Sequence, residues 1–72
     1  MVDKSKMKGV LSKWINAFGW ENGVLEVWFK NGRPIAIHDN VPQEVYRGLF
    51  RDSEFGRNYM ALCKIYPSRQ DA

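Results

Sequence analysis

The chain has 72 residues, of which 44% are hydrophobic and 14% aromatic, with a formal net charge of +3. This length allows one small domain, and the composition excludes a chain that is disordered throughout. The single cysteine, Cys63, excludes an internal disulfide, and no signal peptide or membrane-length apolar run is visible, so we expect a soluble protein in a reducing, cytoplasmic setting.

Positive charge is concentrated at the amino end of the chain. Residues 1–13 hold four lysines and one aspartate, whereas residues 14–72 hold seven basic and seven acidic side chains. This pattern suits a partly flexible basic arm that meets an acidic partner or a phosphate backbone, and it suits equally a frayed terminus that lysines keep soluble. The apolar residues of this arm recur at i, i+3, i+4 and i+7, so a short helix and an irregular lead-in to a strand are both open. These residues are Met7, Val10, Leu11 and Trp14.

From residue 14 onward the apolar residues change to a period of two. This period predicts three antiparallel strands, over residues 14–20, 24–30 and 33–38. An Asn-Gly pair lies in each of the two connections, and this pair is a strong hairpin signal because both residues tolerate positive φ. We therefore expect a three-stranded antiparallel β-meander.

The middle strand places an apolar set of side chains on one face and a mixed set on the other. We expect Ile35 and Ile37 of the third strand to join the apolar face, which requires a second loop of odd length, because a slip of one residue would expose both. The apolar set is Leu25, Val27 and Phe29, and the mixed set is Glu26, Trp28 and Lys30.

The first turn allows two registers. A two-residue turn at Asn22 and Gly23 would place Phe18 and Trp20 on the inner, apolar face. A three-residue turn that begins at Glu21 would instead place these aromatic residues, with Trp14, outside beside Trp28. The first register keeps large aromatic side chains away from water, so we predict it.

Two helices are predicted after the strands, over residues 42–51 and 54–64. Pro42 suits the start of the first helix, Asp52 or Ser53 suits the cap of the second, and Pro67 marks its end. Each helix has an apolar stripe that can pack on the sheet. The fold class is therefore α+β: a three-stranded antiparallel meander covered on one side by two helices, with a basic segment at 1–13, one domain over 14–67 and a flexible tail at 68–72. The stripes are Val45, Tyr46, Leu49 and Phe50, then Phe55, Tyr59 and Leu62.

The residues do not predict an enzyme, a cofactor or a metal site. The only histidine, His38, and the only cysteine, Cys63, form no pair with catalytic or ligand spacing, and no glycine-rich phosphate loop is present. We therefore expect a binding protein without catalytic activity.

Two kinds of partner fit the sequence. The lysines of residues 1–13, with Lys30, Arg33 and Trp28, would suit phosphate contacts and base stacking, although the charge of the remaining chain is balanced. On an open sheet face, Trp28 would instead anchor a protein interface; alternatively, it lies beneath the amino-terminal segment in a second small core. The residues expected to bind a partner are Lys6, Met7, Lys8, Val10, Leu11, Trp14, Trp28, Lys30 and Arg33.

Several motifs resemble the KTSC domain, a small module found at the carboxyl end of some lysyl-tRNA synthetases and as short phage and bacterial proteins. The resemblance covers about 50 of the 72 residues. Gly19-Trp20 stands where the family has Gly-Tyr. Ile35 and Ile37 stand where the family has tyrosines, and Asn58-Tyr59 where it has an aromatic pair. The matching segments are "LEVWFKNG" for L-x-V-x-F-x-N-G, "VPQEVYRGL" for V-P-x-x-V-Y-x-x-L, and then Ser53, Gly56 and Arg57.

This resemblance implies a function as well as a fold. Short basic proteins with this module suggest a phage-type regulator that binds bacterial RNA polymerase in the host cytoplasm, as a monomer. Such a protein would inhibit sigma-dependent initiation or modulate termination, docking through its amino-terminal segment and the face of Trp28. The other function that the resemblance implies is an accessory module for tRNA or DNA. Weak, non-specific nucleic-acid contact through the amino-terminal lysines is compatible with either function.

Overall fold

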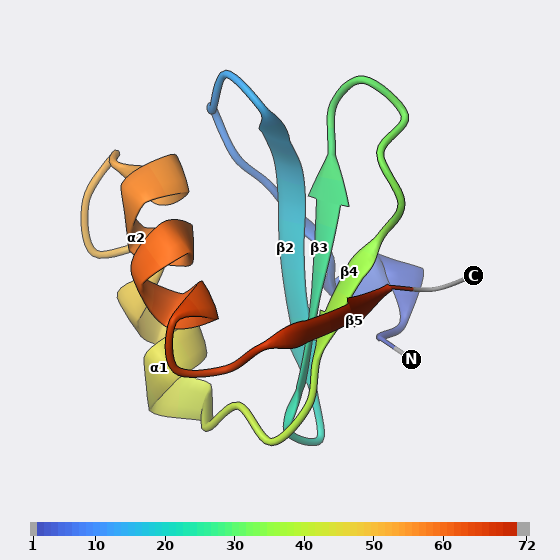
Figure 1. Cartoon of the computed structure of the whole chain (residues 1–72), viewed down its shortest axis with the longest axis vertical. Coiled ribbons are helices and arrows are strands. Elements are labelled where there is room, and N and C mark those ends of the chain that lie inside the picture. Colours follow the sequence, from blue (N-terminus) through green and yellow to red (C-terminus); the bar gives the residue numbers. More distant parts are fainter. Residues whose placement is uncertain (1, 71–72) are drawn as a thin grey trace.

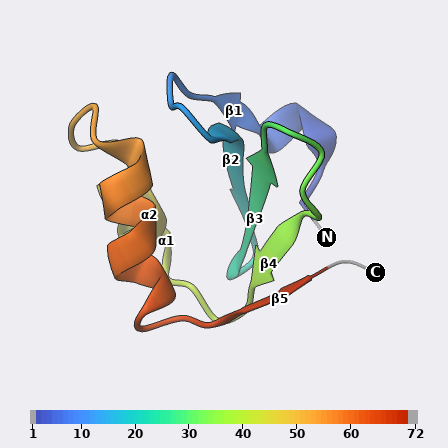
Figure 2. The same cartoon turned by 45° about the horizontal axis from the view of Figure 1, so that its top comes forward.

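An antiparallel sheet with two helices on one face makes up the fold in the computed structural model, which describes residues 2–70. The helices are α1 (Gln43–Gly48) and α2 (Phe55–Cys63), and both lie on one side of the sheet in Figures 1 and 2. The predicted α+β class, with an antiparallel meander and two helices, is confirmed. The strands, in sheet order, are β1 (Lys8–Gly9), β2 (Ile15–Glu21), β3 (Val24–Phe29), β4 (Ala36–His38) and β5 (Ser68–Gln70).

Two of these strands, β1 and β5, lie outside the predicted meander. After α2 the chain returns to the sheet, and β5 pairs with β4 where the sequence predicted a flexible tail. Residues 71–72 of that tail lie outside the described residues. At the other edge, a 3₁₀ turn, η1 (Lys4–Lys6), precedes β1, so the helical spacing over residues 7–14 does not produce a helix. Strands of two and three residues are too short to show alternation in a sequence.

The first hairpin has the predicted two-residue turn. Glu21 pairs with Val24, and both residues of the turn adopt positive φ, 52° at Asn22 and 84° at Gly23. These angles match the right-handed twist of the flanking strands. Phe18 then pairs with Val27, and both side chains are buried beneath the helices, as predicted.

The second hairpin has a different register from the predicted one. Leu25 pairs with His38 and Val27 pairs with Ala36, so His38 and Ala36 share the helix-facing side and Ile37 faces away from it. Ile37 is nevertheless only 4% exposed. The prediction was wrong because it assumed that only one face of the sheet is covered.

The amino-terminal segment covers part of the second face. The Val2 amide donates to Glu26 Oε2 at 3.2 Å, and the Trp28 indole nitrogen donates to Glu26 Oε1 at 2.7 Å. Met7 packs closely against Gly19, where any side chain larger than hydrogen would collide with its sulfur. Trp28 is half-buried on this face, so of the two alternatives left by the sequence the face that carries it is neither fully open nor sealed, because the amino-terminal segment covers part of it.

The helices pack on the sheet through the predicted stripes. Tyr46, Leu49, Tyr59 and Leu62 belong to the main core. The start of α2 differs from the prediction, because Glu54 holds the cap position and no side chain caps it. The remaining core side chains are Ile15, Phe18, Leu25, Val27, Ala36 and Val41.

Candidate functional site

The residues that the sequence nominated for partner binding do not form one surface. Lys6 and Met7 lie on the second face of the sheet, where Met7 packs against Gly19 and the exposed Lys6 forms an ion pair with Glu21 at 3.3 Å. Lys8 and Val10 lie at the β1 edge of the sheet, and Val10 extends its pairing through a 3.1 Å bond to the Asn16 carbonyl. Trp28 is half-buried on the second face, where its indole bonds to Glu26. Leu11 and Trp14 line a hollow between the lead-in to β2 and the start of α2, and Lys30 and Arg33 contact residues beside it.

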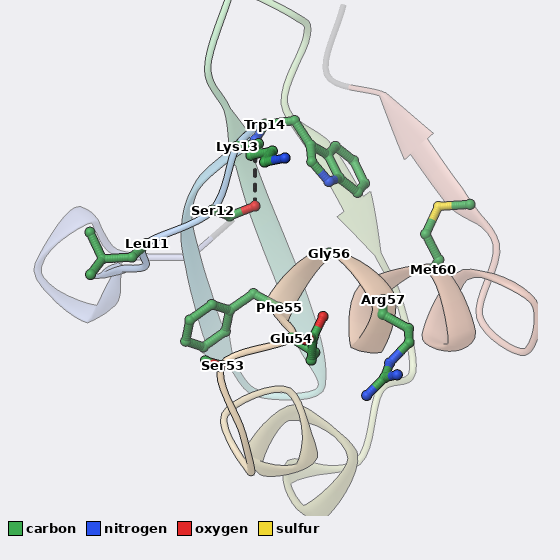
Figure 3. Close-up of a pocket in the computed structure, with 10 residues that line it drawn as sticks. All are labelled: Leu11, Ser12, Lys13, Trp14, Ser53, Glu54, Phe55, Gly56, Arg57 and Met60. Atoms are coloured by element: carbon green, nitrogen blue, oxygen red, sulfur yellow. Dashed lines mark hydrogen bonds between the residues drawn. The ribbon is translucent and has the colours of Figure 1, made fainter.

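This hollow, which we call the Trp14 groove, has a volume of about 530 Å³. One wall is the segment from Leu11 to Trp14, and the other is the segment that leads into α2 together with its first turns (Figure 3). Segments more than 35 residues apart in the sequence thus form a single concave surface. The lining residues are Leu11, Ser12, Lys13, Trp14, Ser53, Glu54, Phe55, Gly56, Arg57 and Met60.

Trp14 is held rigidly at the base of the first wall. Its indole stacks on the Phe29 ring with centroids 5.7 Å apart and an interplanar angle of 8°, and its centroid lies 5.8 Å from that of Tyr59. Its backbone is fixed as well, since its carbonyl accepts from the Lys30 amide at 3.0 Å and its amide donates to Ser12 Oγ at 3.4 Å (Figure 3). The groove therefore has a preorganised aromatic side.

The second wall is positioned by Asn58, a buried polar side chain of α2. Its amide nitrogen donates to the Leu49 carbonyl at 3.3 Å and to Asp52 Oδ1 at 3.1 Å. Asp52 Oδ1 also accepts from the Glu54 amide at 2.8 Å, and this bond is the main reason that the pKa of Asp52 lies below its ordinary value. The connection between the helices is thus tied to α2 just before Ser53 and Glu54 enter the groove.

Large apolar side chains border the groove and remain exposed to solvent. Among residues 2–70, three large hydrophobic side chains are exposed: Leu11 at 93%, Ile65 at 71% and Met60 at 54%. Leu11 lies at one side of the Trp14 groove and Met60 at the other (Figure 3). Ile65 lies elsewhere, at a smaller hollow of about 230 Å³ between the two helices.

The charge at the groove is mainly positive. Lys13 and Arg57 line it, and Glu54 is the one acidic residue among its lining residues. Lys30 reaches the same wall, where its ammonium group donates to the Ser12 carbonyl at 2.5 Å. Arg33 lies over the Phe29 ring, 5.7 Å from its centroid, and this ring stacks on Trp14.

None of these cations forms an ion pair with a carboxylate within the described part of the chain. Ion pairs among residues 2–70 join Lys6 to Glu21, Arg51 to Asp52 and Arg69 to Asp39, and none includes a cation of the groove. The lead-in to β2, the loop between β3 and β4 and the loop before α2 lie at one end of the molecule, the upper end in Figure 1. This end carries Lys13, Lys30, Arg33 and Arg57, so positive side chains are concentrated at one end of the molecule although the net charge of the chain is modest.

The other polar cluster of interest, around His38, is structural. His38 Nδ1 lies 2.6 Å from the Tyr66 carbonyl oxygen, and Nε2 lies 2.9 Å from the Tyr59 hydroxyl. A carbonyl only accepts, so Nδ1 carries the proton and Nε2 accepts from Tyr59. Burial lowers the pKa of His38 and raises that of Tyr59. Both groups are therefore neutral at pH 7, and His38 is fully buried, out of reach of a substrate.

Within residues 2–70 there is no cluster of three or more histidine, cysteine or acidic side chains that could hold a metal ion. In the same part of the chain, no helix has the length and apolar character needed to cross a membrane.

Sequence reasoning found Leu11 and Trp14 but missed the wall contributed by α2. The missed residues with the clearest chemistry are Arg57 and Met60, whereas Lys13 was indicated only as one of the lysines that suit phosphate contacts. One signal was available for Met60, because it lies beside the buried stripe of Phe55, Tyr59 and Leu62 and not within it. An apolar residue outside a helix's buried stripe is a candidate for a binding surface.

No protein-family model matches the chain, and the comparison with curated proteins found no match either.

Proposed function

We propose that this protein is a non-enzymatic binding module that docks on another protein through the Trp14 groove. One observation carries this proposal: two of the three large apolar side chains exposed among residues 2–70, Leu11 and Met60, border the same groove. Exposed apolar groups that converge on a concave surface with an aromatic side are typical of protein-binding sites.

The rigidity of the groove supports this proposal. The Trp14 ring is fixed by Phe29 and Tyr59, and Asn58 ties down the loop that leads into the opposite wall. A partner that binds here loses little free energy to ordering these walls. Met60 adds an unbranched, polarizable side chain that can adapt to the shape of an inserted group.

The partner that we propose is bacterial RNA polymerase, on the basis of the sequence resemblance to phage-type proteins with a KTSC domain. Binding would inhibit sigma-dependent initiation or modulate termination by occupying a polymerase surface or displacing another factor from it. Compared with the expectation from the sequence, the proposed docking surface moves from the Trp28 face to the Trp14 groove, because residues 2–7 cover part of that face.

The test is a binding titration of purified bacterial RNA polymerase, as core enzyme and as holoenzyme, with the labelled protein. We expect Leu11→Ser and Met60→Ser each to weaken binding by about tenfold, the effect of losing an apolar contact worth 1–2 kcal/mol. The matched control is Ile65→Ser, which removes an equally exposed apolar side chain outside the groove and should leave affinity unchanged.

Two results would contradict the proposal. Polymerase that does not bind at micromolar concentration would exclude this partner. Binding that is insensitive to Leu11→Ser and Met60→Ser but is lost in Trp28→Ala would return the docking surface to the second face of the sheet. Transcription from a sigma-dependent promoter, measured with the same variants, would then show whether binding and inhibition share one surface.

Nucleic acid is the second candidate partner, and the observation that favours it is the group of cations at the same end of the molecule. A titration with DNA and RNA at two salt concentrations tests it. Binding that is weak, blind to sequence and steeply salt-dependent would indicate lysine and arginine contacts with phosphates alone. Binding in the nanomolar range at physiological salt would favour nucleic acid over protein as the partner.

A further inference from the structure

We infer that the Trp14 groove recognises an acidic peptide segment that inserts one large apolar side chain, such as phenylalanine or leucine, between Leu11 and Met60. This inference rests on the proposed function, since it names the kind of segment that the partner protein would present. It follows from the size of the groove, from its charge and from the arrangement of its apolar groups.

The size of the groove sets the scale of the ligand. A volume of about 530 Å³ falls within the range of roughly 300–1,000 Å³ that is usual for ligand pockets. This volume exceeds that of any single side chain, so a peptide segment can place one side chain inside and flanking residues along both walls.

The charge of the groove selects an acidic ligand. Lys13 belongs to the first wall and Arg57 to the second, so each wall of the groove carries one cation (Figure 3). Lys30 lies next to Ser12 on the first wall, which adds a third positive group. Glu54 carries the opposite charge. The Asp52 carboxylate lies near Arg57, and this cation makes a small contribution to the lowered pKa of Asp52. Three cations against two carboxylates, Glu54 and Asp52, leave a site with net positive charge that attracts carboxylates.

The apolar groups select a side chain rather than a phosphate chain. Leu11 and Met60 contribute nothing to phosphate binding, but their exposed apolar groups at the two sides of the groove can contact an apolar side chain of a bound segment. One face of the Trp14 ring already stacks on Phe29 at an interplanar angle of 8°, so this indole is a wall of the groove and not a free stacking platform for successive bases. The combination of cations and exposed apolar groups therefore favours an acidic peptide over a nucleic acid.

The experiment is a fluorescence-polarisation titration of the full chain against short labelled peptides. The first peptide has a central phenylalanine flanked by aspartate and glutamate; the second has serine in place of the phenylalanine; the third has lysine in place of each acidic residue. We expect the first peptide to bind, the second to bind at least about tenfold more weakly, and the third not to bind. A single-stranded oligonucleotide of similar length serves as the fourth ligand.

Matched variants locate the binding. Arg57→Glu and Leu11→Ser should each weaken binding of the first peptide by about tenfold. Their controls, Lys64→Glu and Ile65→Ser, likewise reverse a positive charge and replace a large aliphatic side chain with serine, at exposed positions outside the groove, and should change affinity by less than about twofold. Thermal unfolding of each variant shows that it is folded, and amide NMR shifts caused by the first peptide should centre on Lys13 and on residues 54–60.

Several outcomes would overturn the inference. The inference is wrong if the first peptide does not bind, or if the second or third peptide binds as tightly as the first. It is also wrong if Arg57→Glu and Lys64→Glu reduce peptide affinity equally. A third contrary result is an oligonucleotide that binds more tightly than the first peptide and whose affinity is unchanged by Leu11→Ser. The proposed function fails separately. If polymerase binding depends on Leu11 and Met60 but not on Arg57, the groove is the docking surface but the prediction of an acidic segment is wrong. If the first peptide binds through the groove and polymerase does not bind, the predicted type of segment is confirmed but the proposed partner is wrong.

Discussion

The indole nitrogen of Trp14 lies so close to Gly56 that a Cβ atom at position 56 would be 2.6 Å from it. Gly56 belongs to the first turn of α2, and Trp14 belongs to the lead-in to β2, so this contact joins the two walls of the groove. The absence of a side chain at residue 56 allows the aromatic wall to approach the helix this closely.

Gly56→Ala should therefore destabilise the protein although alanine favours helices. A methyl group would collide with the indole of Trp14, which stacks on Phe29, and overpacking of this kind costs about 1–3 kcal/mol. Gly48→Ala is the matched control, because no atom lies within 4 Å of its added methyl group and the higher helix propensity should stabilise by up to about 1 kcal/mol. Urea denaturation measures both, and equal effects of the two substitutions would show that the contact with Trp14 is unimportant.

The free energy of unfolding should decrease as the pH is lowered below about 6.5, the ordinary pKa of histidine. Burial lowers the pKa of His38 in the folded protein, against weaker opposing effects of the Tyr66 carbonyl and Asp39. Between the two pKa values the unfolded chain binds a proton that the folded chain does not, so the free energy of unfolding decreases by up to about 1.4 kcal/mol per pH unit. Above pH 6.5 both forms are neutral and this dependence disappears.

Chemical denaturation between pH 5 and 8 measures this effect. His38 is the only histidine in the chain, so His38→Gln should flatten the profile in this range even if it lowers stability at every pH. A wild-type profile that is already flat from pH 5 to 8 would contradict the lowered pKa. The carboxylates with lowered pKa values, among them Asp39 and Asp52, act in a more acidic range, where stability falls as they become protonated.

Glu26→Gln should weaken the attachment of the amino-terminal segment. Each oxygen of this buried carboxylate accepts one hydrogen bond, one from the Val2 amide and one from the Trp28 indole. A glutamine would place its NH2 group, which only donates, next to one of these two N–H groups. We expect a loss of about 1–3 kcal/mol and faster tryptic cleavage at Lys4 and Lys6. Glu21→Gln, a less buried site on the same face, should lose less stability, and equal losses would argue against a specific role of Glu26.

Asn58→Ala should loosen the second wall of the groove. The substitution removes the bonds to Leu49 and Asp52, with an expected loss of about 1–3 kcal/mol. The pKa of Asp52 should then rise toward its ordinary value, because Asn58 is one of the groups that lower it. NMR titration of the Asp52 carboxyl group tests this directly. Asn16→Ala, at an exposed position in β2, is the control for both measurements.

Much of the fold was accessible from the sequence because its signals are local. The Asn22–Gly23 turn requires two residues that accept positive φ, and it sets the register that buries Phe18 opposite Val27. The stripe of Tyr46 and Leu49 likewise identifies the face of α1 that packs on the sheet. These features depend on neighbours within a few residues, so period and turn chemistry are sufficient to predict them.

The second face of the sheet and the groove were decided by tertiary contacts. Ile37 faces away from the helices, toward the side of the sheet on which Val2 bonds to Glu26, and no local pattern shows where a terminal segment will lie. The Trp14 groove likewise depends on the approach of Gly56 to an indole 42 positions earlier in the chain. The sequence alone determined the three central strands and the two helices, whereas only the tertiary structure decided that β1 and β5 join the sheet and which exposed side chains gather at one site, because both depend on how distant segments pack.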